Sequence, residues 1–419
     1  MKKAFLLIIA LALLCSCSTQ KSAYPTDNTF HAGTDYQYNM FASTNVYCMA
    51  DAGEGFYFWV PMCLLYIDKA TLAPIPVCNK PNCQHYNEAD SERFALCNAF
   101  IPPTTNKISL FWNDNNLYAI QRSELSGKRQ EIIRISADGS RREKLHSLGK
   151  VAVISGVVVH RGYMYIALTS YDENTSVSCG LWAYSLTNPN EKPRLLLELE
   201  GRGNHSVVGN MTAYGNQLYF YIIKNDQFDD TVFVSYDILT DELHEIMTTD
   251  DGYKTSLVTF VKDKMVLVRV NTTTETLGTP VPYEQQLWLC DLDGGNPRML
   301  STDYGIIATD GEYIYRGADY WIPNNPDHYL HIYDADYNEL DKIDLNELPG
   351  VTDPRMFAYY PTMGDRVLFM ENGLRSGRSY MFWFDKSQIG SGAIEVHPVM
   401  DFEDEYRGVF AHGGTLKIK

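Results

Sequence analysis

The stretch that decides the fold lies between residues 151 and 199, where four apolar segments alternate with turns. The segments read VAVISGVVV at 151–159, YMYIALT at 163–169, LWAYS at 181–185 and RLLLEL at 194–199. β-Branched and aromatic residues fill them, and Gly, Asn and Asp lie between them, which is typical of strands joined by turns. The stretch therefore predicts one four-stranded antiparallel unit, ordered from an inner strand to an outer strand.

The same unit recurs along the 419-residue chain at intervals of about 50 residues. Cores of the second strand occur at Phe56-Tyr57, Leu117-Tyr118, Tyr163-Met164-Tyr165, Leu218-Tyr219, Met265-Val266, Ile314-Tyr315, Val367-Leu368 and Leu416-Lys417. This length is typical of the blades of a β-propeller. The apolar faces of each sheet must be covered, so each blade must stack on the next and the ring must close. We expect an all-β fold with a single propeller domain over residues 36–419.

The number of blades follows from counting strands. The third strand of the unit recurs at 64–68, 132–136, 181–185, 232–237, 287–291, 330–334 and 380–385. There are thus eight second strands but seven third strands, because residues 408–419 would supply an inner and a second strand without a successor. A strand near residues 36–40 could complete that blade, so that the two termini close one blade and leave no open edge. The count favours eight blades, and seven is the alternative.

The first residues predict export. Lys2 and Lys3 precede an apolar stretch at 4–14 that suits a secretory signal and is short for a bilayer span. The segment Leu14-Cys15-Ser16-Cys17 resembles the bacterial lipobox, and this resemblance implies a signal peptide at 1–16 and a lipid on Cys17. An ordinary cleaved signal is the alternative. Residues 17–35 are polar and are expected to form a flexible tether.

These features predict an extracytoplasmic protein that is lipid-anchored to the bacterial cell membrane or outer membrane. The formal net charge is −17, and basic runs are short. Nucleic acid is therefore not expected as a partner, because phosphate contacts need a clustered cationic face.

Cysteine and histidine gather in one short region. The run CNKPNCQH at 78–85 is followed by CNA at 97–99, which offers Cys78, Cys83, His85 and Cys97 as ligands. Three thiolates and one imidazole suit tetrahedral zinc, and four protein ligands would make the metal structural. A disulfide from Cys97 to Cys78 or to Cys83 is equally compatible with an exported chain, and free thiols remain a third possibility.

The cluster lies in an insertion at 78–105 that interrupts the connection between the first two blades. In propellers such connections share a face with the loops between second and third strands. The insertion should therefore lie over the side where ligands usually bind. Cys179 and Cys290 fall in third strands and are expected to be buried as small apolar side chains.

At these residues the chain resembles a group of uncharacterised bacterial lipoproteins with TolB-like propeller bodies. The shared features are the lipobox, the strand Tyr66-Ile67-Asp68-Lys69 and the Cys-Asn-Lys-Pro-Asn-Cys-Gln-His run with its later Cys-Asn-Ala. The resemblance implies a fold and a location, and it supplies no catalytic residues.

Candidate ligand-binding residues come from the loops between second and third strands. The loops at 271–286 and 317–328 are long; the first contains Tyr283 and the second contains Tyr320 and Trp321. Neighbouring loops add Asp172 and Arg375 as further candidates. Exposed aromatic rings beside mixed charges suit a glycan or a peptide. Tyr320 and Trp321 could instead pack on their own blade.

Known catalytic signatures are absent from the sequence, which has no G-x-S-x-G elbow, no H-E-x-x-H and no phosphate-binding glycine loop. The preferred hypothesis is a non-catalytic surface lipoprotein that binds a glycan, a peptide or an envelope protein. The alternatives are a hydrolase or lyase with acidic residues in the central channel, and a structural scaffold subunit.

Overall fold

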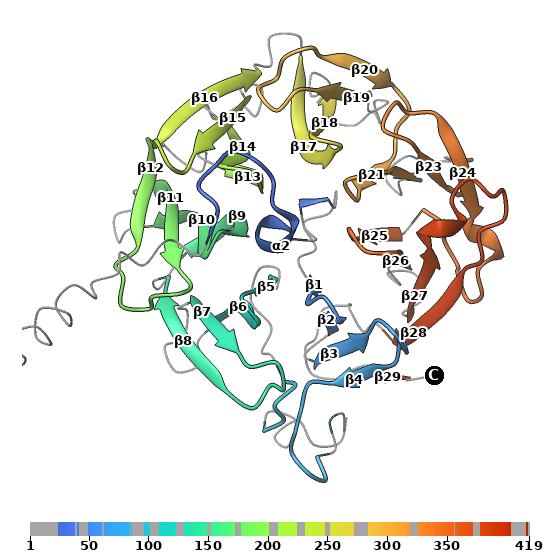
Figure 1. Ribbon diagram of the computed structural model, residues 1–419, viewed down its shortest axis with the longest axis horizontal. Helices are drawn as coiled ribbons and strands as arrows, with labels where there is room; N and C mark the ends of the chain where they lie inside the picture. Colours follow the sequence, from blue (N-terminus) through green and yellow to red (C-terminus); the bar gives the residue numbers. More distant parts are fainter. Residues whose placement is uncertain are drawn as a thin grey trace, which may run out of the picture.

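The chain folds into a ring of antiparallel sheets (Figure 1). The computed structural model describes residues 24–37, 40–41, 49–60, 63–83, 85, 96–100, 109–122, 130–148, 152–171, 177–200, 208–223, 231–247, 252–271, 284–318, 326–355, 357–371, 378–403 and 416–417. Within these ranges the helical elements are α2 (Ala32–Asp35) and the 3₁₀ turns η2 (Leu345–Glu347) and η3 (Lys386–Gln388). No helix in the described ranges has the length and apolar composition that a bilayer span requires.

The blades follow one another along the chain, each running from an inner to an outer strand. Their strands are β1 (Met49–Asp51), β2 (Gly55–Val60), β3 (Cys63–Asp68), β4 (Pro74–Pro76); β5 (Leu110–Asn113), β6 (Asn116–Arg122), β7 (Gln130–Ile135), β8 (Arg142–Ser147); β9 (Ala152–His160), β10 (Tyr163–Tyr171), β11 (Val177–Ser185), β12 (Arg194–Glu200); β13 (Val208–Tyr214), β14 (Gln217–Ile223), β15 (Thr231–Asp237), β16 (Glu242–Met247); β17 (Tyr253–Val261), β18 (Lys264–Asn271), β19 (Gln285–Cys290), β20 (Arg298–Ser301); β21 (Ile306–Thr309), β22 (Ile314–Gly317), β23 (Tyr329–Tyr333), β24 (Glu339–Asp344); and β25 (Phe357–Pro361), β26 (Arg366–Glu371), β27 (Arg378–Asp385), β28 (His397–Glu403), β29 (Leu416–Lys417).

The propeller prediction is confirmed, and the ring has seven blades among the described residues, not the favoured eight. The error lies at Leu416-Lys417. These residues form β29, which pairs with the outer strand β28 through Asp401↔Lys417 and Phe402↔Leu416. A short apolar segment can pair with any open strand edge, so its sequence looks the same in an outer position as in a second strand.

The prediction that the termini share a blade is also wrong. Each sheet is built from one continuous part of the chain, and the first blade already has its inner strand at β1. The first and last blades meet through apolar side chains instead. Phe56 and Leu65 of the first blade lie in one buried cluster with Leu368 and Met400 of the last. Packing between sheets thus closes the ring where a shared sheet was expected.

The stacking of blades follows from the two-residue period of a strand, which sends alternate side chains to opposite faces. In β10, Met164 and Ile166 pack toward the second blade, whereas Tyr165 and Ala167 pack toward the fourth. Both faces of the sheet are therefore buried, which explains why the second strands read as nearly continuous apolar runs.

The two ends of the ring differ. At the end that we call the hairpin face, the innermost strand of each blade turns into the second strand. At the opposite end, the loop face, second strands lead to third strands and each blade connects to the next. The turn at Arg161 and Gly162 has φ values of 45° and 80°, as a two-residue type I′ hairpin requires.

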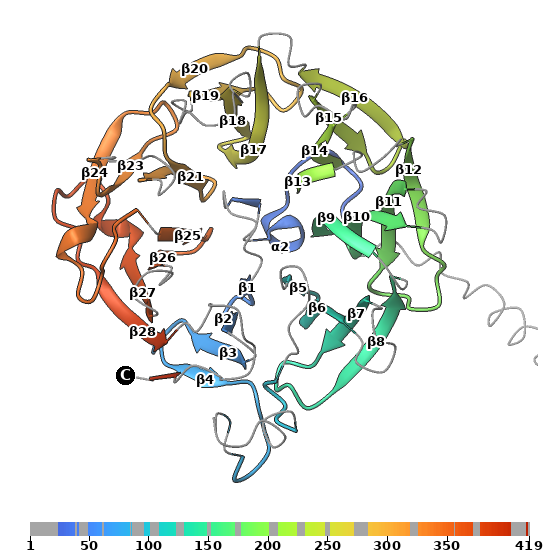
Figure 2. The same cartoon turned by 180° about the vertical axis from the view of Figure 1, so that it is seen from behind.

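The N-terminal segment, residues 24–37 and 40–41, occupies the middle of the ring. Its helix α2 is seen in the centre from both sides (Figure 1, Figure 2). Asp35 is buried and forms an ion pair with Arg161 of the third blade. The predicted tether boundary at residue 35 therefore falls inside a segment that contacts the ring.

Candidate metal centre

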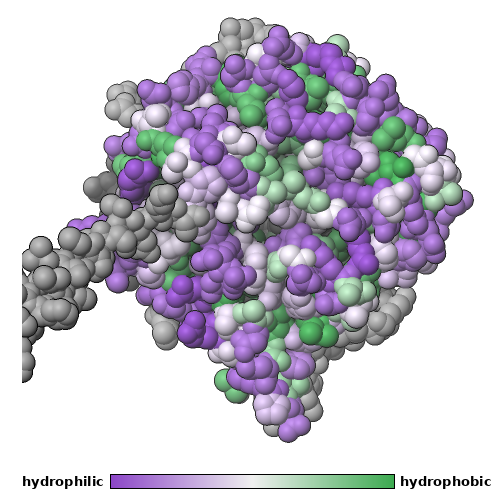
Figure 3. Space-filling model, viewed as in Figure 1, coloured by the Kyte–Doolittle hydropathy of each residue, from purple (hydrophilic) through white to green (hydrophobic). Residues whose placement is uncertain are grey.

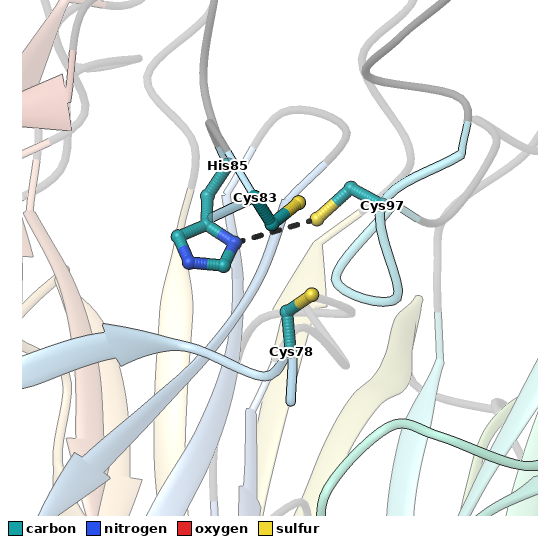
Figure 4. Close-up of side chains that lie close together, drawn as sticks. All are labelled: Cys78, Cys83, His85 and Cys97. Atoms are coloured by element: carbon teal, nitrogen blue, oxygen red, sulfur yellow. Dashed lines mark hydrogen bonds between the residues drawn. The ribbon is translucent and has the colours of Figure 1, made fainter. Parts of the chain in front are cut away.

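Four side chains from the cysteine-rich insertion converge in the structure. The ligand atoms of Cys78, Cys83, His85 and Cys97 all lie within 4.8 Å of one another, and the side chains point toward a common centre (Figure 4). The Cys97 Sγ and His85 Nδ1 are 3.7 Å apart. Tetrahedral zinc, with Zn–S of about 2.3 Å and Zn–N of about 2.0 Å, separates its ligand atoms by roughly 3.5–3.8 Å. The donor set and its spacing therefore fit a zinc ion.

The backbone of the first blade positions these ligands. Cys78 follows β4 directly, and the turn after it is closed by Cys83 N–H donating to the Lys80 carbonyl at 3.4 Å. Cys97 lies in a returning segment that extends the edge of β3, because Leu64 N–H donates to the Ala99 carbonyl at 2.7 Å. The ligands thus come from two chain segments fixed to the same sheet.

Backbone N–H groups surround the sulfur atoms. Ala99 N–H donates to the Cys97 Sγ at 3.4 Å, and the N–H groups of Lys80 and Asn98 donate to the Cys78 Sγ. Such bonds favour a thiolate and orient it, as outer-shell groups do around metal ligands.

Without a cation between them, the negative charge on one sulfur atom disfavours the ionisation of its neighbours. Burial raises the pKa of Cys78, but hydrogen bonds from the N–H groups of Lys80 and Asn98 and from the Cys97 and Cys83 thiols outweigh burial, and the net pKa is lowered. Burial raises the pKa of Cys97 to about 12, and the neighbouring Cys83 and Cys78 add to the rise. One thiolate is therefore favoured, whereas three thiolates together need a cation.

Arg142 supplies positive charge beside the cluster. Its Nη2 donates to the Asn98 carbonyl. Burial lowers the pKa of Arg142, and the Cys97 thiolate opposes this effect. Three thiolates around one divalent cation leave a single negative charge, which the guanidinium can offset across a short distance.

The cluster also links three blades. Asn98 Nδ2 donates to Asn79 Oδ1 at 2.8 Å, and Asn79 Nδ2 donates to Asp138 Oδ2 at 3.0 Å. Asp138 lies in the turn before β8, so this chain of bonds ends on the second blade. On the other side, Cys97 packs in the apolar cluster that joins the first and last blades.

The described cysteines are all free thiols, so neither expected disulfide is formed. Cys179 and Cys290 are buried in β11 and β19, as expected. Cys63 is a further buried thiol beside the cluster; burial raises its pKa, and the negative charge of Cys97 raises it further.

The remaining sites expected from sequence lie outside the described residues. These are Cys17, Asp172, Tyr283, Tyr320, Trp321 and Arg375. Sequence reasoning found all four metal-ligand candidates but missed Arg142, Asn79 and Asn98. The repeated Cys-Asn dipeptide at 78–79 and 97–98 was the available signal for the two asparagines.

Comparisons with known proteins identify the fold. No family model and no curated protein matches the chain. Among solved structures, a prolyl endopeptidase matches with a TM-score of 0.55 and 11% identity, over 86% of this chain and 51% of that one. A puromycin-hydrolyzing peptidase from Mycobacterium tuberculosis matches with a TM-score of 0.52 and 11% identity, over 90% and 56%.

TolB from Acinetobacter baumannii is also similar, with a TM-score of 0.38 and 13% identity, over 84% of this chain and 78% of TolB. The chain spans about half the length of the two peptidases that it matches. At 11% identity the likeness to the two peptidases shows a shared fold and nothing of the chemistry.

Proposed function

We propose that this chain is an extracytoplasmic, lipid-anchored propeller protein in which the Cys3His cluster holds a structural zinc ion. The observation that carries the zinc proposal is the convergence of Cys78, Cys83, His85 and Cys97 within 4.8 Å. Three soft sulfur ligands and one imidazole select zinc over the hard cations magnesium and calcium.

The role is structural rather than catalytic. Four protein ligands fill a tetrahedral zinc ion and leave no position for a substrate. The described part of the insertion projects from the outer rim, away from the central channel, and not over the ligand-binding side as the sequence led us to expect (Figure 1, Figure 3). A metal at this place would fix the insertion to β3 and β4 and tie it to the second blade through Asn79. Because the ligands belong to separate segments, metal binding and folding of the insertion are coupled.

The ring itself is a non-catalytic binding scaffold in this proposal. The lipobox-like segment ending at Cys17 supports surface anchoring, and the acidic composition suits a soluble body. The ligand classes that suit its loops are a glycan, a peptide or an envelope protein. The solved peptidases that share the fold are about twice as long as the matched region, and at 11% identity the likeness transfers no catalytic role to this chain.

Elemental analysis tests the metal proposal. Protein purified without chelator or reductant should contain about one zinc per chain, and His85→Ala should lose it. His244→Ala is the matched control, because His244 is exposed on an outer strand with a side-chain exposure of 57%. Metal-free protein with blocked thiols would instead support a disulfide.

A further inference from the structure

The N-terminal segment binds one end of the ring. On the third blade, Arg161 donates to Asp35, and its Nη1 also donates to the Asp27 carbonyl at 2.8 Å. On the fourth blade, Asn216 N–H donates to Asn28 Oδ1 at 2.9 Å. Both Arg161 and Asn216 lie in the turns from innermost to second strands, which places the segment at the hairpin face.

Each of the other five blades also contacts the segment from the same end. The contacts are Tyr36 OH to Asp51 Oδ2 at 3.2 Å, Gln37 Nε2 to the Trp112 carbonyl at 2.7 Å, Thr259 Oγ1 to the Met40 carbonyl at 3.1 Å, Thr309 N–H to the Phe41 carbonyl at 2.8 Å, and Met363 N–H to the Tyr36 hydroxyl. The segment therefore contacts all seven blades and lies over the hairpin end of the channel.

The beginning of this segment is fixed as well. The Tyr24 hydroxyl accepts a hydrogen bond from Asn113 Nδ2 at 3.1 Å. Its ring lies so close to Gly162 that a Cβ there would be 2.5 Å from the Tyr24 Cε2. Gly162 and Asn113 both belong to the hairpin face, so the chain enters the ring from that side.

The length of chain before Tyr24 limits where the ring can lie. Cys17 is seven positions before Tyr24, and seven extended residues span at most about 25 Å. The nine residues of β10 measure about 30 Å along a blade. A tether of this length cannot pass from the hairpin face around the rim and leave the loop face toward a membrane.

We infer that the hairpin face is turned toward the lipid bilayer and that the loop face is turned away from it. This inference rests on the proposed lipid on Cys17. The hairpin face itself need not bind lipid, because the chain is acidic and anionic headgroups would repel it. The ring is held near the bilayer by a short tether, and ligands have free access to the loop face.

Energy transfer to labelled lipid measures this orientation. The full acylated chain is bound to vesicles of phosphatidylethanolamine and phosphatidylglycerol that contain an acceptor lipid. A donor dye is attached through an azide-bearing phenylalanine at Glu312 or at Glu347. Both glutamates are exposed. Glu312 lies in the turn between β21 and β22, and Glu347 lies in the connection from β24 to β25, so they form a matched pair on opposite faces.

Transfer should be at least about twofold more efficient from position 312 than from position 347. Equal or reversed efficiencies would overturn the inference. Inserting about twenty Gly and Ser residues before Tyr24 should remove the difference, because the limit comes from tether length. A Cys17→Ala chain should not float with vesicles. If the unaltered chain also fails to float, the anchor proposal is wrong, and the orientation falls with it; if it floats with reversed efficiencies, only the orientation is wrong.

Discussion

The guanidinium of Arg161 donates two parallel hydrogen bonds to the carboxylate of Asp35, from Nε to Oδ1 at 2.9 Å and from Nη2 to Oδ2 at 2.8 Å. Both side chains are buried, with exposures of 4% and 0%. Burial raises the pKa of Asp35, but the bonds from Arg161 more than offset this, and the net pKa is lowered. The pair holds the N-terminal segment in the ring.

Removing the guanidinium should be costly. Arg161→Ala leaves the Asp35 carboxylate buried without its partner, which costs about 3–5 kcal/mol of unfolding free energy. Arg298→Ala is the control, because its pair with Asp336 is exposed and should change stability by less than about 1 kcal/mol. Urea unfolding measures both. Similar effects from the two variants would show that the segment is not held by this pair.

Acid should lower the stability of the folded chain, because His160 resists protonation in its buried position. Burial lowers the pKa of His160 to about 4, although the charge of Asp35 works in the opposite direction. Above the ordinary histidine pKa of about 6.5 the ring is neutral in both folded and unfolded chains, so stability is complete there. As the pH falls from 6.5 to 4, the unfolded chain takes up the proton first, and up to about 3 kcal/mol is lost.

The measurement is the urea midpoint at pH values between 7 and 4. His160→Gln cannot gain this proton, so its stability should depend less on pH within that window. Parallel curves for the two proteins would exclude His160 as the source.

The seam between the first and last blades should depend on apolar packing. Leu368 is fully buried in the cluster that joins them, and Leu368→Ala should cost about 2–5 kcal/mol. Leu267→Ala is the comparison. Leu267 is also fully buried, in the apolar cluster between the fourth and fifth blades. Hydrogen exchange should accelerate in β2 and β26 for the first variant only. Acceleration at the seam in both variants would contradict this closure.

Arg142 should strengthen metal binding without touching the metal. Arg142→Gln removes the positive charge beside Cys97 and the bond to the Asn98 carbonyl, and zinc affinity should fall about 10–100-fold. Arg141→Gln is the neighbouring control, since Arg141 is exposed. Competition with a zinc chelator gives both affinities. Unchanged zinc affinity for Arg142→Gln would show that this guanidinium does not stabilise the bound metal.

The fold was predictable because blade strands carry a strong local signal. Alternating apolar residues and Gly or Asp turns correctly located all seven third strands, from β3 to β27. The blade number was not predictable in the same way. The pair Leu416-Lys417 has the composition of a second strand, and only its pairing with Phe402 and Asp401 reveals an outer position.

The convergence of the four candidate ligands was predictable because they lie close together in sequence. The surrounding groups were not, because Asn79 meets Asp138 and Asn98 meets Arg142 across a blade boundary. The sequence predicts a tether at 17–35 because the residues there are mostly polar and show no strand or helix pattern. Hydrogen bonds, an ion pair and a few separate apolar contacts, such as Phe30 on Tyr214, hold the segment in the ring, and none of these leaves a local sequence pattern. Its partner Arg161 lies 126 positions from Asp35.

X-ray absorption at the zinc edge is the most direct measurement of the central claim. Protein isolated from membranes without chelator should show a first shell of three sulfur atoms at about 2.3 Å and one nitrogen at about 2.0 Å. A first shell of oxygen and nitrogen alone, or protein without zinc, would contradict a metal centre at Cys78, Cys83, His85 and Cys97.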